Sequence, residues 1–214
     1  VSVLVKGSLH TDELLDAVVA PGSGLRTERR ISHAYAMDVP AYAKPLIITD
    51  AAINIQPTLE HKRDICQNAV DLLRHLGQEN PRVAVLAAVE TVNPKMPATL
   101  DAAALTVMAA RGQITGAQVD GPLAFDNAIS TDAARTKGIV SPVAGNADIL
   151  LVPDLEAGNM LAKQLIHFAG AIAAGIVLGA RVPIVLTSRA DPLTARIASA
   201  ALAKLLAAPR AAAG

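Results

Sequence analysis

Apolar and polar residues are arranged along the chain in two kinds of segment. Short runs rich in valine, isoleucine and leucine predict buried strands at residues 1–5, 31–37, 46–48, 83–86, 149–152 and 182–186. Longer segments with an apolar residue every three or four positions predict helices at residues 12–20, 58–76, 99–111, 156–170 and 192–207. Strands that alternate with helices in this way predict a doubly wound α/β protein with a parallel sheet.

The segment 58–76 has the clearest helical pattern. Ile65 and Leu72 fall on its apolar face, and charged residues lie mostly away from that face. Thr58 has the side chain of a helix N-cap, and Gly77 is a residue at which helices commonly stop. This segment therefore predicts one amphipathic helix.

Residues 161–180 form the most apolar segment, and their length alone would suit a membrane span. Lys163, Gln164 and His167 interrupt the segment, as do three glycines. We therefore predict one or two buried helices, a hinge near residues 170–175 and no membrane partner.

The composition narrows the class of partner. Apolar residues make up 52% of the chain but aromatic residues only 2%, so aliphatic side chains must build the core. Nucleic-acid recognition uses aromatic stacking or a basic surface, and the 19 basic residues are balanced by 19 acidic ones. The composition therefore argues against a nucleic-acid partner.

The single cysteine, Cys66, cannot form an intrachain disulfide. The Cys and His spacings that are typical of zinc sites are also absent from the sequence. We therefore expect a reducing, cytoplasmic setting and no metal site.

The segment after the strand at residues 182–186 has the strongest candidate chemistry. Ser188 and Arg189 follow this strand, and Asp191 before Pro192 predicts the N-cap of the next helix. Loops of this kind open at the carboxyl edge of an α/β sheet, where ligands bind. An arginine suits a phosphate group, and the hydroxyl of Ser188 can donate to a developing oxyanion.

A second candidate segment follows the strand at residues 149–152. Asn159 and Lys163 lie four positions apart and share a helix face, so both could contact one anionic ligand. In the alternative interpretation Gly158 only permits tight packing and Lys163 is solvated.

Two further candidates have more ordinary explanations. Asp120 begins an Asp-Gly-Pro turn after a short strand, so turn formation is its first expected role and ligand binding its second. Arg26 and Arg30 belong to a basic cluster that could reach a phosphate, although a solvated surface is the default interpretation.

Several short motifs resemble those of the phosphate acetyltransferase and phosphate butyryltransferase family, in the expected order. They are Asp-Gly-Pro-Leu at residues 120–123, Pro-Asp-Leu-Glu-Ala-Gly-Asn at 153–159 with Lys163 after it, and Ser-Arg-Ala-Asp at 188–191. Lys-Gly-Ser-Leu-His-Thr at 6–11, Ile-Ser-His-Ala-Tyr-Ala-Met at 31–37, Val-Glu-Thr-Val at 89–92 and Lys-Met-Pro-Ala-Thr at 95–99 extend the resemblance over almost the whole chain. It is strongest to the butyryltransferase-like branch, including the transferase part of bifunctional enoyl-CoA hydratase/phosphate acetyltransferases.

The resemblance implies a two-domain, three-layer α/β/α fold of the isocitrate and isopropylmalate dehydrogenase type. Residues 1–27 and 174–214 would belong to domain one, and residues 28–173 would form domain two, which supplies a homodimer surface. Family members have a substantial portion before the Lys-Gly motif that here stands at Lys6. We therefore expect this chain to be truncated at its N-terminus and its first domain to be incomplete.

The resemblance also implies reversible transfer of a short acyl group between CoA and inorganic phosphate, with no metal or redox cofactor. Arg189 would bind the phosphoryl group and Ser188 would face the oxyanion or the leaving sulfur. The family's aspartate base corresponds to Ala195 here, so Asp191 is the remaining candidate for that role. The resemblance places Asp16 where the acetyltransferase branch has an arginine, and Arg26 or Arg30 would supply the lost charge.

Two other functions stay open. A truncated, non-catalytic domain could retain CoA binding or dimerisation without turnover. A dehydrogenase of the same fold is less favoured, because no G-x-G-x-x-G motif follows a strand and no cluster of metal-binding aspartates is evident in the sequence.

Overall fold

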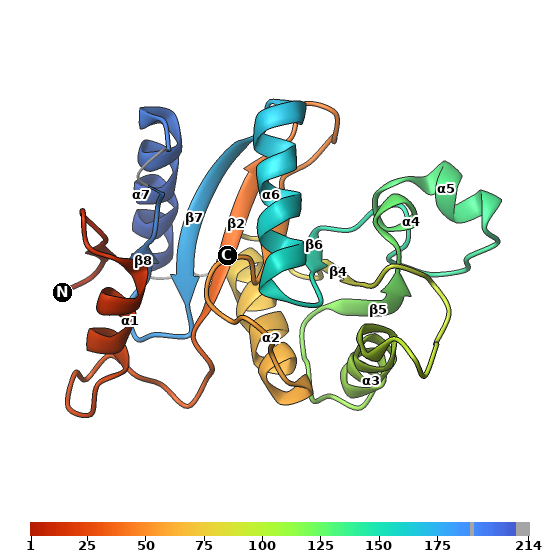
Figure 1. Ribbon diagram of the computed structural model, residues 1–214, viewed down its shortest axis with the longest axis horizontal. Helices are drawn as coiled ribbons and strands as arrows, with labels where there is room; N and C mark the ends of the chain where they lie inside the picture. Colours follow the sequence, from red (N-terminus) through yellow and green to blue (C-terminus); the bar gives the residue numbers. More distant parts are fainter. Residues whose placement is uncertain (189–190, 209–214) are drawn as a thin grey trace.

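A computed structural model describes residues 1–188 and 191–208, and it has a mixed α/β fold around one eight-stranded sheet (Figure 1). The strands lie in the order β1-β8-β7-β2-β3-β6-β4-β5. Their bounds are β1 Leu4–Val5, β2 Ser32–Asp38, β3 Leu46–Thr49, β4 Arg82–Leu86, β5 Gln118–Leu123, β6 Ile149–Leu151, β7 Ile172–Leu178 and β8 Ile184–Val185. All six strands that the apolar runs predict are confirmed.

The helices of the described residues are α1 Thr11–Val19, α2 Leu59–His75, α3 Pro97–Ala110, α4 Phe125–Ile129, α5 Thr131–Thr136, α6 Leu155–Ala169 and α7 Leu193–Ala207. The predicted helix at residues 58–76 is confirmed as α2. Its N-cap is Thr58, whose side-chain oxygen accepts a hydrogen bond from the His61 backbone N–H at 3.3 Å. Gly77 follows the helix with a φ of 98°, a conformation that favours glycine.

Strand directions differ from the predicted parallel sheet. β3, β6, β4 and β5 run parallel to one another, but β2 is antiparallel to both β3 and β7. β8 pairs antiparallel with β7 and parallel with β1. The parallel prediction is therefore wrong for this half of the sheet, because a short connection through Gly179 turns the chain back beside β7. Consequently β8 runs in the opposite direction to β3, and its C-terminal end lies at the sheet edge where β3 starts.

The prediction of one or two helices over residues 161–180 is also wrong in part. α6 ends at Ala169, and Gly170 takes the left-handed conformation with a φ of 67°. The chain then continues as β7, whose isoleucines and valine suit a buried strand. Among the described residues no helix combines the length and the apolar character that a membrane crossing requires.

Helices cover both faces of the sheet. On one face α2, α3 and α7 contribute Ile65, Leu105 and Leu202 to a common core. On the other face α6 contributes Ala162 to a second core, and α1 contributes Val18 to a third. Figure 1 shows α1 and α6 standing apart, with β7 and β2 between them. The middle of this face is thus the region that the two helices flank.

Candidate functional site

His33, Tyr35 and Gly175 form the middle of the sheet face between α1 and α6, and we call them the central floor. Tyr35 pairs with Gly175 across β2 and β7. The His33 and Tyr35 rings make an edge contact, with centroids 4.4 Å apart and planes at 75°. Because Gly175 lacks a side chain, the Leu186 carbonyl and His33 Nε2 both approach its Cα; a Cβ there would clash with the carbonyl oxygen. The central floor therefore brings β2, β7 and the end of β8 together.

Asp50 lies directly after β3, beside the central floor, and its carboxylate is almost fully buried. Its two oxygens accept hydrogen bonds from the backbone N–H groups of His33, Ala52, Ile53 and Asn54, at 2.9 to 3.3 Å. The Asn54 side-chain amide donates a further bond of 2.6 Å to Oδ2. This carboxylate thus fixes the loop after β3 against the start of β2.

Burial holds the pKa of His33 below its ordinary value, so the imidazole is neutral near pH 7. The Asp50 carboxylate, the Leu186 carbonyl and the Asp191 carboxylate act on this pKa in the opposite direction. Burial, followed by the field of Asp191, raises the pKa of Tyr35. The negative charge of Asp191, in the loop before α7, therefore acts on the pKa values of both side chains.

The loop after β8 differs from its predicted geometry. α7 begins at Leu193 with Pro192 as its N-cap residue, and Asp191 precedes both. Asp191 Oδ2 instead accepts a hydrogen bond from the Ser188 backbone N–H at 2.6 Å. The predicted N-cap role of Asp191 is therefore wrong, because its carboxylate turns back into the loop. The predicted phosphate ligand, Arg189, lies outside the described residues.

Ser188 lines a cavity of about 420 Å³ together with Lys6, Gly7, Ser8 and Arg196. The Lys6 ammonium donates to the Leu9 carbonyl oxygen at 3.0 Å, which holds the Lys-Gly turn in shape. The structure thus places the Lys-Gly motif that follows β1 beside Ser188, which follows β8, although more than 170 residues separate them in the chain.

Arg26 and Arg30 line one cavity of about 500 Å³ between α1 and the start of α2. Arg30 Nε donates to Asn54 Oδ1 at 2.7 Å, so Arg30 is connected through Asn54 to Asp50. Arg26 forms no hydrogen bond or ion pair with the residues of the described ranges. The structure therefore brings these two predicted residues together, at the opposite edge of the sheet from Ser188.

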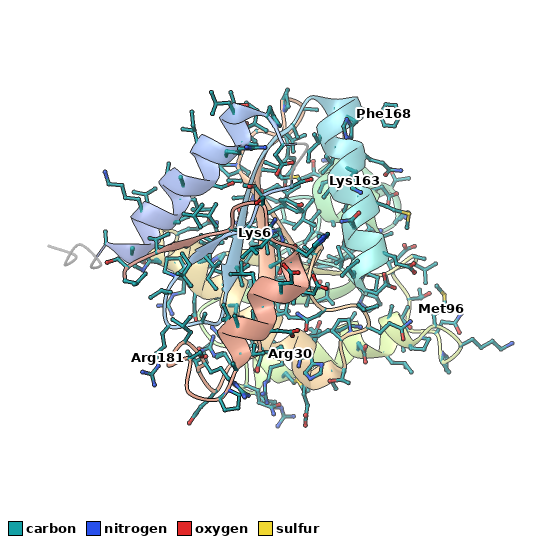
Figure 2. The ribbon with its side chains drawn as sticks, turned by 60° about the vertical axis from the view of Figure 1, so that its left-hand side comes forward. Lys6, Arg30, Met96, Lys163, Phe168 and Arg181 are labelled. Atoms are coloured by element: carbon teal, nitrogen blue, oxygen red, sulfur yellow. The ribbon has the colours of Figure 1, made fainter. Side chains whose placement is uncertain are left out.

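Asn159 and Lys163 both lie on α6, as predicted. The Asn159 amide donates to the Ala51 carbonyl at 3.1 Å, which ties α6 to the loop after β3. A Cβ on Gly158 would lie 2.9 Å from the Asp50 carbonyl oxygen, so this glycine permits close packing, as in the alternative interpretation. Lys163 is exposed on the helix (Figure 2).

Asp120 does not form the predicted turn. It lies inside β5, pairs with Ala84 of β4, and its Oδ1 accepts a hydrogen bond from the Gly121 backbone N–H at 2.9 Å. The Asp-Gly-Pro sequence misled the prediction because the strand continues to Leu123. β5 and β8 lie near opposite ends of the strand order, so Asp120 is not brought near Ser188.

Residues 1–188 and 191–208 contain no group of three His, Cys, Asp or Glu side chains that could hold a metal ion. Cys66 is buried in α2, and burial raises the pKa of its thiol to about 12. The thiol is therefore protonated and inaccessible, so Cys66 belongs to the core and not to a reactive site.

Sequence reasoning missed His33 and Asp50 as members of the site. His33 stands inside an apolar strand, where a histidine is an unusual residue, and that was the available signal. Asp50 follows an apolar strand and precedes an Ala-Ala pair, which gives no indication of its buried hydrogen-bond partners.

A family model described as "Phosphate acetyl/butaryl transferase" matches residues 1–204. Phosphate acetyltransferase from Rickettsia prowazekii is 66% identical over 207 residues, which cover 96% of this chain and 59% of that protein. Phosphate butyryltransferase from Clostridium acetobutylicum is 45% identical over 205 residues, which cover 96% and 68%. The chain thus spans about three fifths of the length of the rickettsial relative.

A branched-chain phosphotransacylase from Enterococcus faecalis has a similar structure, with a TM-score of 0.89, 36% identity, and coverage of 96% of this chain and 74% of that one. A 4-hydroxythreonine-4-phosphate dehydrogenase from Klebsiella pneumoniae shares the fold at a TM-score of 0.53 and 18% identity, over 97% of this chain and 65% of that one. The match to the family model over residues 1–204 shows that the chain belongs to the phosphate acetyl/butaryl transferase family.

Proposed function

We propose that the chain transfers a short acyl group between CoA and inorganic phosphate, so that acyl-CoA and phosphate give acyl phosphate and CoA. The observation that supports this most strongly is the family match over residues 1–204, which includes the Ser-Arg-Ala-Asp loop. Relatives named for acetyl and for butyryl transfer both match almost the whole chain. A short acyl group is therefore the group that we propose is transferred.

The geometry suggests a path for CoA across the sheet face. Its phosphates would bind Arg26 and Arg30 in the cavity before β2, and its thiol would reach the loop of Ser188 and Asp191 after β8. These positions lie at opposite edges of the sheet, and seven residues of β2 span about 20 Å at roughly 3.3 Å each. This separation suits an extended molecule that carries phosphates at one end and a thiol at the other. Asn159 and Lys163 would line the α6 side.

In the direction of acyl-CoA synthesis, a thiol attacks the carbonyl carbon of the acyl phosphate. The S–C bond forms and the C–O bond to phosphate breaks. The thiol proton ends on the departing phosphate. We assign Arg189 to the phosphoryl group and the Ser188 hydroxyl to the carbonyl oxygen as it gains charge. Asp191 receives the thiol proton, since Ala195 has no side chain that could do so. Asp120 has no place in this arrangement.

The transfer moves no electrons, so we propose CoA and phosphate as substrates and no further cofactor. The isolated, buried Cys66 suits a reducing compartment such as the cytoplasm.

We further propose two lobes, with residues 28–173 as one and residues 1–27 with 174–214 as the other. The separate core clusters to which α6 and α1 belong on one sheet face support this division.

A homodimer through the α6 side is the proposed assembly. Phe168 is 91% exposed and projects from the end of α6 (Figure 2). It lines an apolar groove with Phe125, Leu161 and Leu165. Exposed aromatic side chains beside an apolar groove are typical of protein interfaces. Analytical ultracentrifugation of Phe168→Glu should give the monomer mass if this groove is the interface.

The function is tested by measuring free thiol released from acetyl-CoA and butyryl-CoA, with and without phosphate. Release that requires phosphate supports the transferase, and Arg189→Ala should lower the rate by about a hundredfold or more, as expected when a charged transition-state contact is lost. Arg181→Ala, on the exposed turn that precedes β8 and so at the opposite end of that strand from the loop, is the matched control. CoA binding without any release would favour the alternative of a non-catalytic domain.

A further inference from the structure

Arg30 (Figure 2) lines the cavity of about 500 Å³ between α1 and α2, and it is exposed, yet three hydrogen bonds hold it in place. Its backbone N–H donates to Asp64 Oδ2 at 3.1 Å, and its carbonyl accepts from the Asn68 side-chain amide at 2.8 Å. Its Nε donates to Asn54 Oδ1 at 2.7 Å. An exposed arginine ordinarily has many accessible rotamers, so these bonds set its guanidinium in advance for a ligand.

Asn54 is the residue that fixes the guanidinium. Asn54 is 3% exposed, and its amide NH₂ group donates to Asp50 Oδ2 at 2.6 Å and to the Ile31 carbonyl at 2.9 Å. A carboxylate and a carbonyl can only accept, so the NH₂ group must face them and Oδ1 must face Arg30. Asp50 is itself held by backbone N–H groups of its loop. The chain of bonds from Asp50 through Asn54 thus connects a fixed loop to the cavity.

The cavity keeps three sets of N–H donors available. The two Nη groups of Arg30 donate to none of the described residues, and Arg26 in the same cavity has no partner among them either. His61 lines the cavity as well, and its Nδ1 accepts the Thr58 backbone N–H at 3.4 Å. The other nitrogen, Nε2, therefore carries the proton in the neutral ring and is a donor.

The carboxylates of this cavity do not cancel its positive charge. Asp64 Oδ1 is paired with Arg63 at 2.9 Å. Arg29, which also lines the cavity, is already paired with Asp71 at 2.8 Å. Glu28 is the one remaining carboxylate that lines it in the described part of the chain, and it stands against two arginines without an ion pair. The cavity is therefore positive and favours an anion.

An apolar wall lies beside these donors. It consists of Leu15 and Val19 from α1 and Ile53 from the loop after β3. The adenosine end of CoA carries a flat adenine ring and a 3′-phosphate on the same ribose, so it presents an apolar surface and a terminal phosphate close together. A cavity with an apolar wall and convergent N–H donors suits a ligand of this kind.

We propose that Asn54 is a positioning residue, which directs the Arg30 guanidinium at the 3′-phosphate of CoA. Arg26 and the Nε2–H of His61 donate to the same phosphate, and the adenine ring lies on the apolar wall. This inference rests on the proposed function and names the part of CoA that the cavity takes. Asn54 itself does not touch CoA, and no bond forms or breaks at this end of the molecule. The site therefore sets the affinity for CoA.

The test compares CoA with dephospho-CoA, which lacks only the 3′-phosphate, by isothermal titration calorimetry. The wild-type chain should bind CoA at least about tenfold more tightly, the scale of charge-assisted hydrogen bonds, and Asn54→Ala should reduce this ratio to about threefold or less. Arg111→Ala, an exposed arginine at the end of α3, is the control and should keep the wild-type ratio. Equal affinities in the wild-type chain, or an unchanged ratio in Asn54→Ala, would overturn the proposal.

A double-mutant cycle separates positioning from a merely structural role. The ratio compares two ligands within one variant, so a general loss of folded protein does not change it. If Asn54 acts through Arg30, Asn54→Ala should have no further effect on the ratio in the Arg30→Ala background. Two independent, multiplying losses would contradict the proposal. In turnover, Asn54→Ala should raise KM for CoA by about the same factor as the ratio falls and leave kcat nearly unchanged.

Arg30→Lys tests the same inference without a buried substitution, in case Asn54→Ala does not fold. Lysine keeps the charge but has no Nε–H for Asn54 to hold, so most of the preference for CoA should be lost. A wild-type ratio in Arg30→Lys would show that charge alone suffices and would overturn the positioning role. Acyl transfer together with equal binding of the two ligands would overturn this inference alone. A CoA preference without transfer would overturn the proposed function alone, and absence of CoA binding would overturn both.

Discussion

The carboxylate of Asp50 accepts a hydrogen bond from the backbone N–H of His33, with 3.2 Å between Oδ2 and the nitrogen. This bond joins the end of β3 to the start of β2, and the same carboxylate receives four more donors from its own loop. The position of the central floor therefore depends on one buried charge, whose removal should affect stability as well as chemistry.

Asp50→Asn should destabilise the fold by about 3 kcal/mol, since a charged acceptor of several hydrogen bonds is replaced by an amide whose NH₂ group faces donors. Urea unfolding followed by circular dichroism measures this loss. Asp132→Asn replaces an exposed carboxylate and should stay within about 0.5 kcal/mol of the wild type. A similarly small change in Asp50→Asn would contradict the role given to Asp50.

Gly158→Ala should also destabilise the chain, although alanine favours a helix. The added Cβ would lie 2.7 Å from Val152 Cγ2 and 2.9 Å from the Asp50 carbonyl oxygen, so α6 has to move away from the loop. We expect a loss of about 1–3 kcal/mol, the usual cost of overpacking. Gly7→Ala, where a Cβ meets open space, is the control and should be nearly neutral. Equal stability of the two variants in urea unfolding would contradict the tight contact.

Cys66 should resist thiol reagents in the folded chain. Burial raises the pKa of its thiol to about 12, so almost no thiolate exists at pH 8 and reagents have no access to it. Colour release from a disulfide reagent should be slow in buffer and rapid in denaturant. Rapid release from the folded chain would show that α2 does not bury this residue.

Stability should decrease as the pH falls below the ordinary His pKa of 6.5. The folded-state pKa of His33 is lower than this value, so below pH 6.5 the unfolded chain binds a proton that the folded chain does not. The contribution of His33 is complete above pH 6.5 and is lost as the pH falls toward the folded value. Denaturant titrations at several pH values should show a shallower decrease in His33→Asn. The same slope in both proteins would contradict a buried, neutral His33.

The sequence predicts local structure well where the signal itself is local. The apolar face of residues 58–76 and the cap at Thr58 predict α2, and the apolar runs predict six of the strands. Of the other two strands, β7 was missed, and the short strand expected before Asp120 was ended too early. β7 is rich in alanine and glycine and follows an apolar helix, so its pattern resembles more helix. β5 contains Gly-Pro, which ordinarily indicates a turn.

The site was harder to predict because its partners are distant in the sequence. Asp50 contacts a backbone amide seventeen residues away, and Lys6 shares a cavity with Ser188 through strand pairing alone. No local pattern specifies either relationship. Asp191 was assigned to the helix it precedes, whereas its carboxylate bonds to Ser188 behind it. The motifs identified the loop, but only the fold shows which side chains surround it.

The most direct test of the central claim is to measure acyl phosphate and free CoA together, as hydroxamate and as thiol, when the chain is supplied with acetyl-CoA or butyryl-CoA and phosphate. The account predicts equal amounts of both products, formed only when phosphate is present. Release of CoA without acyl phosphate, or at a rate independent of phosphate, would contradict it.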